Sequence, residues 1–262
     1  MLTLSSISLN FGGLQVLQDV NLSVPEHGIF GLIGPNGAGK TTVFNLVTGL
    51  LTPGPGSIEF MGRRIDRMLP HRITRSGIAR TFQNIRIFKD MTLIDNVLVA
   101  LGGRPSYGVA TVLLQWRNYR VAEGKDREVA RGLLSKVGLA DKSEQRAARL
   151  SYGEQRRLEI ARALATGPKL LLLDEPAAGM NAVEKQQLID EIVKLNAGGL
   201  TIFIIEHDMS VIMGLCHEIT VLNFGRVIAR GTPAQIRTNP EVIEAYLGKD
   251  EHSPSRPEGV SP

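Results

Sequence analysis

A glycine-rich segment between an apolar run and a helix-compatible stretch constrains the fold of this chain more than any other feature. Residues 34–41, GPNGAGKT, satisfy the pattern G-x-x-x-x-G-K-[S/T]. The preceding run, Ile29–Ile33, is apolar without alternation, which is typical of a strand buried on both faces. The following stretch, Val43–Leu51, favours a helix that the prolines and glycines of residues 53–56 would end. A structural glycine-rich turn is the alternative, but the strand–loop–helix context predicts a protein that binds a nucleotide.

The loop supplies the groups that bind a polyphosphate. Its glycines let backbone N–H groups converge on phosphate oxygens, and the helix that follows adds the positive end of its dipole. We expect Lys40 to bring a positive charge to the β- and γ-phosphates and the Thr41 hydroxyl to bind Mg²⁺. The residues expected to line the phosphates are Gly34, Pro35, Asn36, Gly37, Ala38, Gly39, Lys40, Thr41 and Thr42.

A second apolar run ends in two acidic residues. Leu170–Leu173 is flanked by Pro168 and leads into Asp174 and Glu175. At the end of a buried strand, Asp174 is the expected carboxylate on the metal side, and Glu175 is the expected general base for the attacking water. Two ordinary acids at a strand end are the alternative. Their combination with the phosphate loop favours hydrolysis of the nucleotide over binding alone.

Composition and charge exclude several classes of protein. The chain has 43% hydrophobic and 21% charged residues, typical of a globular protein, and a net charge of +4, too small to indicate a nucleic-acid partner. The single cysteine, Cys216, is expected to be a core or surface residue rather than a catalytic thiol. No apolar run reaches the roughly 18 residues that span a bilayer. The N-terminus carries no export signal, so a cytoplasmic location is expected.

Patterning predicts an α/β fold with antiparallel strands first and helices in the middle. Val20, Leu22 and Val24 alternate with polar residues as in a half-buried strand, and residues 57–60 resume a strand. Residues 116–137 indicate a helical insertion that ends at Gly138. Thr92 and Asp95 resemble a capping box. The basic stretch from Arg63 to Arg80 favours a solvated face, with a membrane- or partner-facing patch as the alternative.

The second half predicts a parallel crossover and a terminal hairpin. Strands at residues 169–174 and 200–206 flank a helix at about 183–195, which implies a right-handed parallel connection. Residues 219–230 read as a hairpin around Asn223-Phe224-Gly225, and Asn239-Pro240 begins a last short helix. The polar segment from Lys249 onward is expected to be disordered.

A third motif lies before the acidic strand. Ser151 and Glu154 fit the S-x-x-E capping box at the start of a helix that ends at Gly167-Pro168. A helix start with a hydroxyl and a nearby glycine, here Gly153, is also an anion site. Spacing alone favours the cap.

Together these motifs resemble those of the ATP-binding cassette (ABC) ATPases. The segment LSYGEQ at 150–155 is similar to the signature motif of that family, and Ser151 lies 23 residues before Asp174, as the family would have it. The resemblance covers residues 2 to about 248. It implies a P-loop NTPase core with a mostly parallel sheet, an N-terminal antiparallel β subdomain and a helical subdomain that carries the signature. The implied ATPase domain is residues 1–248, with its helical subdomain at about 92–165 and a tail at 249–262.

The resemblance also implies roles that the residues alone do not. Phe11 resembles the aromatic that stacks on adenine, Gln83 the glutamine that contacts Mg²⁺ and the attacking water, and His207 the histidine that contacts the γ-phosphate. A lone Gln or His would otherwise be read as structural. In the family, two ATPase subunits sandwich ATP head to tail, and the residues implied to close the partner's site are Ser151, Gly153 and Glu154. The implied cofactors are ATP and Mg²⁺, with the metal near Thr41, Gln83 and Asp174.

Two positions depart from the family's pattern. Asn181, in AAGMN, stands where an aspartate is usual, which bears on communication across the dimer. Tyr152 replaces a residue of the LSGGQ form of the signature. Neither departure touches the phosphate loop or Glu175.

Longer stretches are similar to the ATP-binding subunit of bacterial branched-chain amino acid importers. They include TFQNIRIFKDMTLIDNVLVA, LSYGEQRRLEIARAL, DEPAAGMN and VIEAYLG. The insert between Val99 and Gly124 is similar to the larger of the two ATPase subunits in such systems. This resemblance implies amino-acid uptake through two membrane-embedded permease subunits, fed by a periplasmic binding protein. The chain would then lie on the cytoplasmic face of the inner membrane beside an identical or related ATPase subunit.

The permease contact and two other functions stay open at this point. Ile85, Ile87 and Phe88 are candidates for the contact, with packing inside the helical subdomain as an equal alternative. The other functions are export of lipid or lipopolysaccharide by an ABC ATPase, and a soluble ABC ATPase in DNA repair or on ribosomes. Soluble members usually carry a long coiled-coil insertion or two cassettes, which this sequence lacks. A P-loop kinase is excluded because it would not need LSYGEQ.

Overall fold

Ten strands and the helices that connect them make up the described part of the chain. The computed structural model describes residues 1–102 and 116–247. Its strands are β1 (Leu2–Phe11), β2 (Leu14–Val24), β3 (Ile29–Ile33), β4 (Ser57–Phe60), β5 (Arg63–Arg64), β6 (Ile78–Arg80), β7 (Leu170–Asp174), β8 (Thr201–Ile205), β9 (Glu218–Asn223) and β10 (Arg226–Gly231). Its α-helices are α1 (Lys40–Val47), α2 (Pro70–Ser76), α3 (Leu93–Gly102), α5 (Trp116–Lys136), α6 (Tyr152–Ala165), α7 (Ala182–Ala197), α8 (Met209–Leu215), α9 (Pro233–Arg237) and α10 (Pro240–Leu247).

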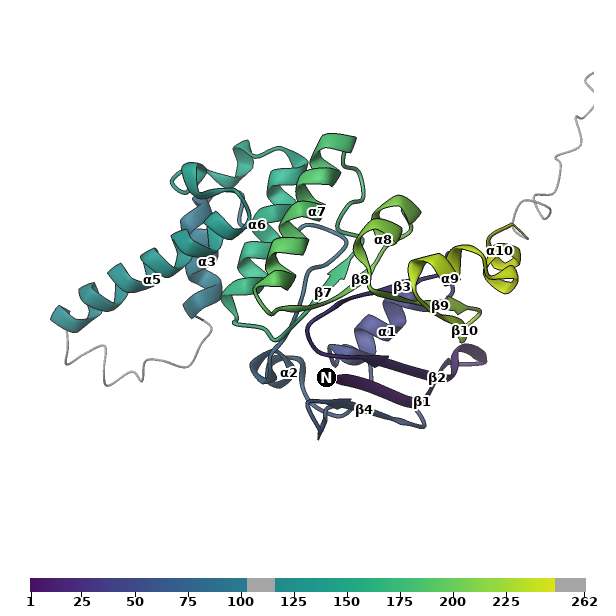
Figure 1. Cartoon of the computed structure of the whole chain (residues 1–262). Coiled ribbons are helices and arrows are strands. Elements are labelled where there is room, and N and C mark those ends of the chain that lie inside the picture. Colours follow the sequence, from purple (N-terminus) through teal and green to yellow (C-terminus); the bar gives the residue numbers. More distant parts are fainter. Residues whose placement is uncertain (103–115, 248–262) are drawn as a thin grey trace, which may run out of the picture.

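The strands form two sheets that lie one above the other (Figure 1). The larger sheet has the order β10-β9-β3-β8-β7-β6 and is parallel except for β10 at its edge. The smaller sheet is antiparallel, with the order β2-β1-β4-β5. The expected combination of a mostly parallel sheet with an N-terminal antiparallel one is therefore confirmed.

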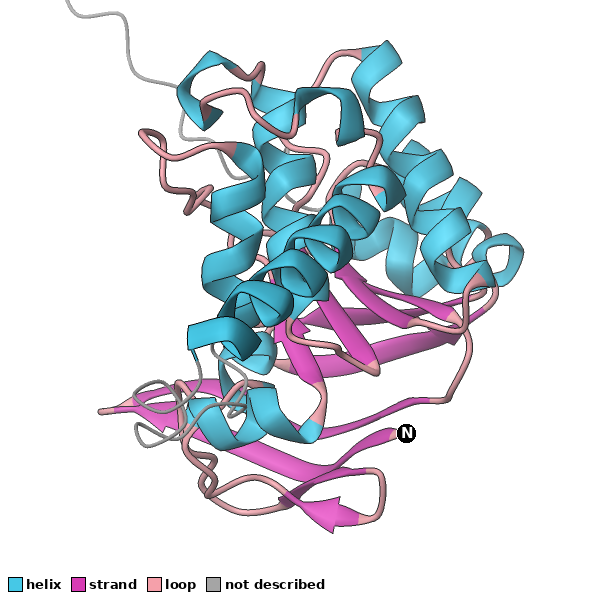
Figure 2. Cartoon of the chain, turned by 90° about the vertical axis from the view of Figure 1, so that its left-hand side faces the viewer, coloured by secondary structure: helices cyan, strands magenta, loops and turns pink. Residues whose placement is uncertain are grey.

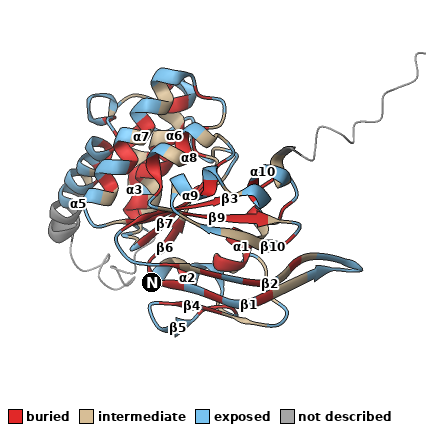
Figure 3. Ribbon diagram, turned by 45° about the vertical axis from the view of Figure 1, so that its right-hand side comes forward, coloured by how far each residue is buried: buried red, intermediate tan, exposed pale blue. Residues whose placement is uncertain are grey.

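Side-chain alternation on the buried strands divides the interior into two cores. On β7, Leu170 and Leu172 pack with α1 and the smaller sheet, whereas Leu171 and Leu173 pack with the helices on the opposite face. The strands β3 and β8 alternate in the same way. Both faces of the larger sheet are covered, and its central strands β3, β7 and β8 are accordingly buried along their length and apolar except for Asp174 and Thr201 at strand ends (Figures 2 and 3).

Three helices, α3, α5 and α6, pack together beside the larger sheet, and we call them the helical group. Buried Leu93 and Val97 of α3 and Leu134 of α5 belong to the same core as Leu158 of α6. After α5, Gly138 adopts a left-handed φ of +65° and its N–H donates to the Ser135 carbonyl, as expected for a helix C-terminus. The part of the expected insert at 103–115 and the expected tail at 249–262 lie outside the described residues.

Several local predictions are confirmed. The strands β7 and β8 are parallel neighbours joined through α7. The β9–β10 hairpin turns through Phe224 and Gly225, whose φ angles of +42° and +75° are both left-handed, as in a type I′ turn. The Asn239 side chain accepts a hydrogen bond from the Glu241 N–H at the start of α10. Cys216 is buried, and burial raises the pKa of its thiol to about 12, so it is a core residue.

Two helix boundaries differ from expectation. α1 spans Lys40–Val47 rather than residues 43–51, because the phosphate loop leads directly into it and Gly49, at φ +71°, ends it early. At α3, the Thr92 hydroxyl oxygen accepts a hydrogen bond from the Asp95 N–H at 3.1 Å, as a cap should. The Asp95 carboxylate, however, accepts from the Thr92 hydroxyl at 2.6 Å, so the reciprocal half of the expected capping box is replaced. The shorter aspartate side chain accounts for this difference.

Replacing Gly225 by Ala tests how far the β9–β10 turn supports the phosphate loop. The Gly225 N–H donates to the Ala38 carbonyl at 3.0 Å. A Cβ atom at Gly225 would lie 2.2 Å from the Val16 carbonyl oxygen. We expect Gly225→Ala to lower the free energy of unfolding by about 1–3 kcal/mol and to weaken nucleotide binding, as measured by urea unfolding and fluorescent nucleotide titration.

Gly62→Ala is the matched control. Gly62 also has a left-handed φ, of +73°, but a Cβ atom added there would have no neighbouring atom within 4 Å. The substitution should therefore carry the backbone cost alone and leave nucleotide binding intact. Equal effects of the two substitutions on nucleotide binding would contradict the supporting role of the turn.

Candidate functional site

The phosphate loop lies between β3 and α1 at the centre of the larger sheet. Gly34 approaches β9 so closely that a Cβ atom would sit 1.9 Å from the Leu222 carbonyl oxygen, so only glycine fits there. Gly39, at φ +103°, begins α1, and the exposed Thr41 lies in the first turn of that helix. The first N–H groups of α1 therefore have no partner within the helix and can bind phosphate oxygens.

Lys40 extends back over its own loop. Its side chain is buried, and its Nζ donates to the carbonyl oxygens of Gly34 at 2.7 Å and Pro35 at 2.9 Å. The ammonium group is thus held inside the curve of the loop, where phosphates bound by the loop's N–H groups would meet it. The loop and the acidic strand are far apart in the sequence. The parallel pairing of β3 with β8 and of β8 with β7 brings them close together in the sheet.

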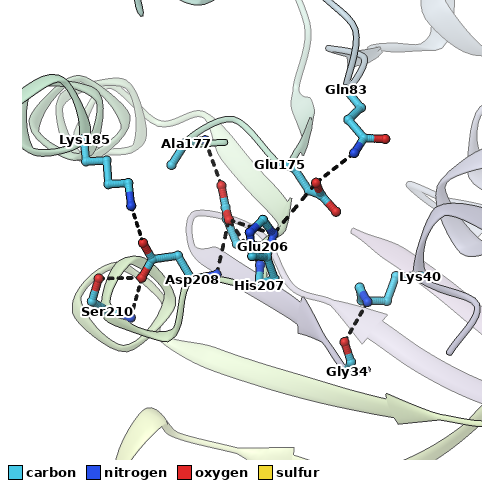
Figure 4. Close-up of polar contacts among 10 residues, drawn as sticks. All are labelled: Gly34, Lys40, Gln83, Glu175, Ala177, Lys185, Glu206, His207, Asp208 and Ser210. Atoms are coloured by element: carbon cyan, nitrogen blue, oxygen red, sulfur yellow. Dashed lines mark hydrogen bonds and ion pairs between the residues drawn. The ribbon is translucent and has the colours of Figure 1, made fainter. Parts of the chain in front are cut away.

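Three residues expected to be catalytic meet at the carboxyl ends of the parallel strands (Figure 4). Gln83 comes from the loop after β6, Glu175 directly follows β7, and His207 follows β8. The Gln83 Nε2 donates to Glu175 Oε2 at 2.9 Å, and His207 Nδ1 lies 3.8 Å from the same oxygen. The phosphate loop with Lys40 follows β3, the parallel neighbour of β8, so it leaves the sheet at the same carboxyl edge. The sequence could not show this convergence, because parallel strands bring their ends together only in the sheet.

Glu175 occupies a strained backbone conformation. Its φ is +47°, which side chains other than glycine rarely adopt, and its N–H donates to the Ile205 carbonyl at 2.9 Å. A left-handed residue of this kind costs about 1–3 kcal/mol and is concentrated at functional sites. The turn that it makes at the end of β7 directs its carboxylate toward Gln83 and His207.

Asp174 is held by Arg80, for which the sequence pattern predicted the wrong environment. Arg80, expected on a solvated face, is buried and its Nη2 donates to Asp174 Oδ2 at 2.7 Å, with both side chains 5% exposed. The guanidinium also donates to Asn45 Oδ1 and lies over the rings of Phe44 and Phe82. Asp174 therefore keeps an ion pair on one oxygen and has the other for further ligands. The rest of the basic stretch behaves as expected, since Arg63, Arg67, Arg72 and Arg75 are exposed.

A second missed residue, Glu206, organises the segment around His207. It is 1% exposed, and its carboxylate accepts hydrogen bonds from the N–H groups of Ala177, His207 and Asp208 at 2.7, 3.1 and 3.4 Å. Burial raises its pKa above the usual range for glutamate. These bonds join the segment after Glu175 to the segment after β8, the two segments that carry Glu175 and His207. No motif signals it, because a buried glutamate is apparent only once its surroundings are known.

The signature segment caps α6. Ser151 Oγ accepts from the Glu154 N–H, and the Glu154 carboxylate accepts from the Ser151 N–H at 3.0 Å, so the predicted capping box is confirmed. Glu154 also pairs with Lys142. On its other side the segment faces the start of α7, where Ser151 Oγ lies 3.5 Å from Glu184 Oε1. The signature segment is therefore held by α7 and Lys142. The residues at the strand ends are joined by a separate hydrogen bond, between Gln83 and Glu175.

The residues at the two departures from the family's pattern both have defined local contacts. Asn181 caps α7, accepting from the Glu184 N–H at 2.9 Å while the Glu184 carboxylate accepts from the Asn181 N–H at 3.2 Å. An asparagine caps a helix as well as an aspartate does. The Tyr152 ring is 44% exposed and lies against Gly179. Gly153 lies close to Glu184, where a Cβ atom would be 2.9 Å from Oε1.

The residues expected at adenine and at the metal are compatible with those ligands. Phe11 ends β1 before a left-handed Gly12, and its ring is 49% exposed, as a stacking platform requires. Thr41, Gln83 and Asp174 offer oxygen atoms, which are the ligands that Mg²⁺ prefers. Among the described residues there is no group of three or more His, Cys, Asp or Glu side chains that could hold a metal ion. A magnesium ion at this site would therefore depend on the nucleotide's phosphates as well as on the protein.

A groove of about 310 Å³ lies behind the Gln83 loop. Its walls come from α2, α3, α6 and the loop, and include Phe82, Arg86, Glu159 and Arg162. Of the three candidates for a permease contact, Ile87 packs partly against the main core, whereas Phe88 is 44% exposed beneath the Arg162 guanidinium. A larger cavity of about 690 Å³ opens near the amino ends of β7 and β8, and no expected site residue lines it.

No helix in the described ranges 1–102 and 116–247 has the length and apolar character needed to cross a membrane.

Comparison with known proteins identifies the family of the chain. Residues 17–178 match the model of the ABC transporter family, and residues 226–252 match that of the branched-chain amino acid ATP-binding cassette transporters. The high-affinity branched-chain amino acid transport ATP-binding protein LivG of Escherichia coli is 44% identical, over 95% of this chain and 98% of that protein. The lipopolysaccharide export system ATP-binding protein LptB of Haemophilus influenzae is 32% identical, over 95% of this chain and 98% of that protein.

A solved structure agrees with these matches. The ADP conformation of MJ1267, an ATP-binding cassette of an ABC transporter, superposes with a TM-score of 0.82 at 29% identity, covering 95% of this chain and 98% of that one. The family match, the LivG identity and the shared fold all extend over the phosphate loop and the acidic strand. The chain therefore belongs to the ABC transporter family of ATP-binding cassette ATPases.

Proposed function

We propose that this chain is the ATP-hydrolysing subunit of an importer of branched-chain amino acids. The convergence of Gln83, Glu175 and His207 at the carboxyl edge of the sheet, where the phosphate loop also leaves β3, is the observation that supports hydrolysis. The substrate class rests on the 44% identity to LivG and on the match at residues 226–252. In this proposal residues 1–248 are the ATPase domain, and residues 92–165, which include the helical group, are its helical subdomain.

In this proposal each of the site residues has one part in the hydrolysis of ATP. The loop N–H groups and Lys40 would hold the β- and γ-phosphates, and Phe11 would stack on adenine. Thr41 and the free oxygen of Asp174 would hold Mg²⁺, which supplies positive charge to the phosphate oxygens when bound. Glu175 Oε2 would take the proton of the attacking water, while the Gln83 amide next to it orients that water. His207, close to Glu175, would donate toward the γ-phosphate.

Closure of the site requires a second ATPase subunit. Ser151 Oγ accepts its capping bond from the Glu154 N–H, and its hydroxyl donates to Glu184 Oε1 at 3.5 Å, a long hydrogen bond that a phosphate oxygen could replace. A cap and a phosphate ligand are therefore compatible uses of one hydroxyl. In a head-to-tail pair, the partner subunit's Ser151 would meet the γ-phosphate held by the first subunit, whether the partner is an identical or a related chain.

The membrane partners would bind near the groove behind the Gln83 loop. Phe88 and Ile85 are our candidates for contact with two membrane-embedded permease subunits, which would receive the amino acid from a periplasmic binding protein. Such contacts would hold the chain at the cytoplasmic face of the inner membrane. Export of lipopolysaccharide is the less favoured alternative, because LptB is 32% identical whereas LivG is 44% identical over the same share of the chain.

Glu175→Gln tests the proposed function directly. The substitution keeps the size of the side chain but removes its basic oxygen, so ATP hydrolysis should fall by about 10²–10⁴-fold while Mg-ATP still binds. With hydrolysis blocked, an ATP-dependent dimer should accumulate on gel filtration. In cells whose own gene carries this substitution, uptake of radiolabelled leucine should be lost.

Asp174→Asn is the comparison for Glu175→Gln. It should weaken Mg²⁺-dependent nucleotide binding, and it should also lower stability because buried Arg80 loses its counter-charge. Substantial phosphate release by the Glu175→Gln protein would show that another residue is the general base. Normal leucine uptake by cells with an inactive ATPase would refute the assigned substrate class.

Ser151→Ala separates the capping role from the dimer role. Loss of the cap should cost about 1 kcal/mol of stability, whereas loss of a γ-phosphate ligand should abolish ATPase activity and leave ATP binding to the monomer intact. Thr232→Ala is the control, since Thr232 caps α9 in the same capping-box geometry. If both variants lose similar stability and keep full activity, Ser151 is a cap alone.

Lys40→Ala removes the positive charge inside the phosphate loop. The β- and γ-phosphates would then lie uncompensated in a confined site, so nucleotide binding should weaken strongly and hydrolysis should vanish. Isothermal titration with ATP and a phosphate-release assay measure both effects. The control is Lys169→Ala, at the opposite end of β7. A normal rate of hydrolysis in Lys40→Ala would show that the loop does not bind the reacting phosphates.

A further inference from the structure

A fully buried ion pair lies on α6, and the proposed mechanism does not use it. Arg156 is 0% exposed, and its Nη1 donates to Glu159 Oε2, one helical turn further on, at 2.7 Å. Burial raises the pKa of Glu159, and the charge of Arg156 opposes that rise. Because buried charges are costly to desolvate and apolar residues often pack as stably in their place, stability alone does not account for this pair.

The pair holds the backbone of the Gln83 loop. Arg156 Nη1 donates to the Phe82 carbonyl at 2.5 Å, and its Nη2 donates to the Gln83 carbonyl at 2.7 Å. The Phe82 N–H in turn donates to Glu159 Oε1 at 3.4 Å. The planar guanidinium thus fixes two successive carbonyl groups, a geometry that a lysine ammonium cannot reproduce.

This clamp, by which we mean Arg156, Glu159 and their bonds to residues 82 and 83, leads directly to the proposed catalytic base. The Gln83 Nε2 donates to Glu175 Oε2 at 2.9 Å, so the residue whose carbonyl Arg156 holds is the one that contacts Glu175. A second α6 residue, Arg162, donates to the Arg86 carbonyl further along the loop. The loop is therefore attached to α6 at two places, at residues 82 and 83 and again at Arg86.

The same helix and the same groove connect the clamp to the proposed partners. Ser151 caps α6 a little more than one turn before Arg156, so one helix carries both the signature hydroxyl and the clamp. Phe82 and Glu159 also line the groove behind the loop. A movement of α6, or a segment seated in that groove, would act on the residues that hold Gln83.

We propose that Arg156, braced by Glu159, is a positioning residue that sets the Gln83 side chain against Glu175 and ties that contact to the position of α6. This inference rests on the proposed function, since it assigns Gln83 and Glu175 to the hydrolysis of ATP. A misplacement of about 1 Å in such a constellation can cost about 10²-fold in rate.

The test uses the full-length chain purified with its permease subunits and compares Arg156→Lys with Arg157→Lys. Arg157 is the neighbouring residue on α6 and pairs with Glu191 at 3.0 Å, on the side of α7 rather than of the loop. We expect Arg156→Lys to lower kcat about 10–100-fold with little change in the KM for ATP. Arg157→Lys should leave kcat within about twofold of the parent, while thermal unfolding shows similar stability for both variants. Equal kcat values for Arg156→Lys and the parent would overturn the proposal.

A double-mutant cycle separates positioning from a general structural role. If Arg156 acts through Gln83, adding Arg156→Lys to a Gln83→Ala complex should change kcat by no more than about twofold. Multiplication of the two single losses would instead show that Arg156 acts independently of Gln83 and would overturn the proposal. The outcome is distinct from a failure of the proposed function, because Glu175→Gln reports on that function whether or not Arg156 affects Gln83.

Discussion

The close approach of the phosphate loop to the β9–β10 hairpin is the contact on which the rest of the site depends. Gly34 leaves β3 against the Leu222 carbonyl, with no room for a side chain, and the Gly225 N–H holds the Ala38 carbonyl from the other side of the hairpin turn. The loop is thus fixed between a central strand and an edge hairpin before any ligand binds. That fixed loop sets where α1 begins, where Lys40 lies, and which strand ends can face a bound phosphate. A preformed anion site of this kind loses little conformational entropy on binding.

The acidic half of the site shows three ways of keeping carboxylates at a strand edge. Asp174 is paired with buried Arg80, Glu206 is satisfied by three backbone N–H groups, and Glu175 is left with the Gln83 amide and nearby His207. These bonds fix Asp174 through one oxygen, which leaves the other for a metal, and fix Glu206 between two neighbouring segments. Only Glu175 combines partial exposure with a strained backbone, so the residue proposed to accept a proton is the one least neutralised by its surroundings.

The helical group reaches this site through one helix. α6 begins at the Ser151 capping box, holds residues 82 and 83 through Arg156, and contributes Leu158 to the core shared with α3 and α5. Because hydrogen bonds join α6 to the Gln83 loop, a change in the position of these helices would be transmitted to that loop. Arg162, over the exposed Phe88 ring, extends the same attachment toward the groove. The fold therefore links a surface suited to a partner with the atoms that would activate water.

The sequence by itself determined the local units: the phosphate loop, the buried strands 29–33 and 170–174, the hairpin at 219–230 and the Ser151–Glu154 cap. Each is encoded by neighbours within a few residues, as apolar runs, glycines at left-handed positions or capping pairs. It misjudged Arg80 and gave no sign of Glu206 or Arg156, and it placed the ends of α1 wrongly. The bonding partners of these arginines lie far away in the sequence. Arg80 and Asp174 are 94 residues apart, and Arg156 and Phe82 are 74 residues apart. Whether an arginine is solvated or buried depends on what the sheet and helices bring beside it, so only the tertiary structure decided which charged residues build the site.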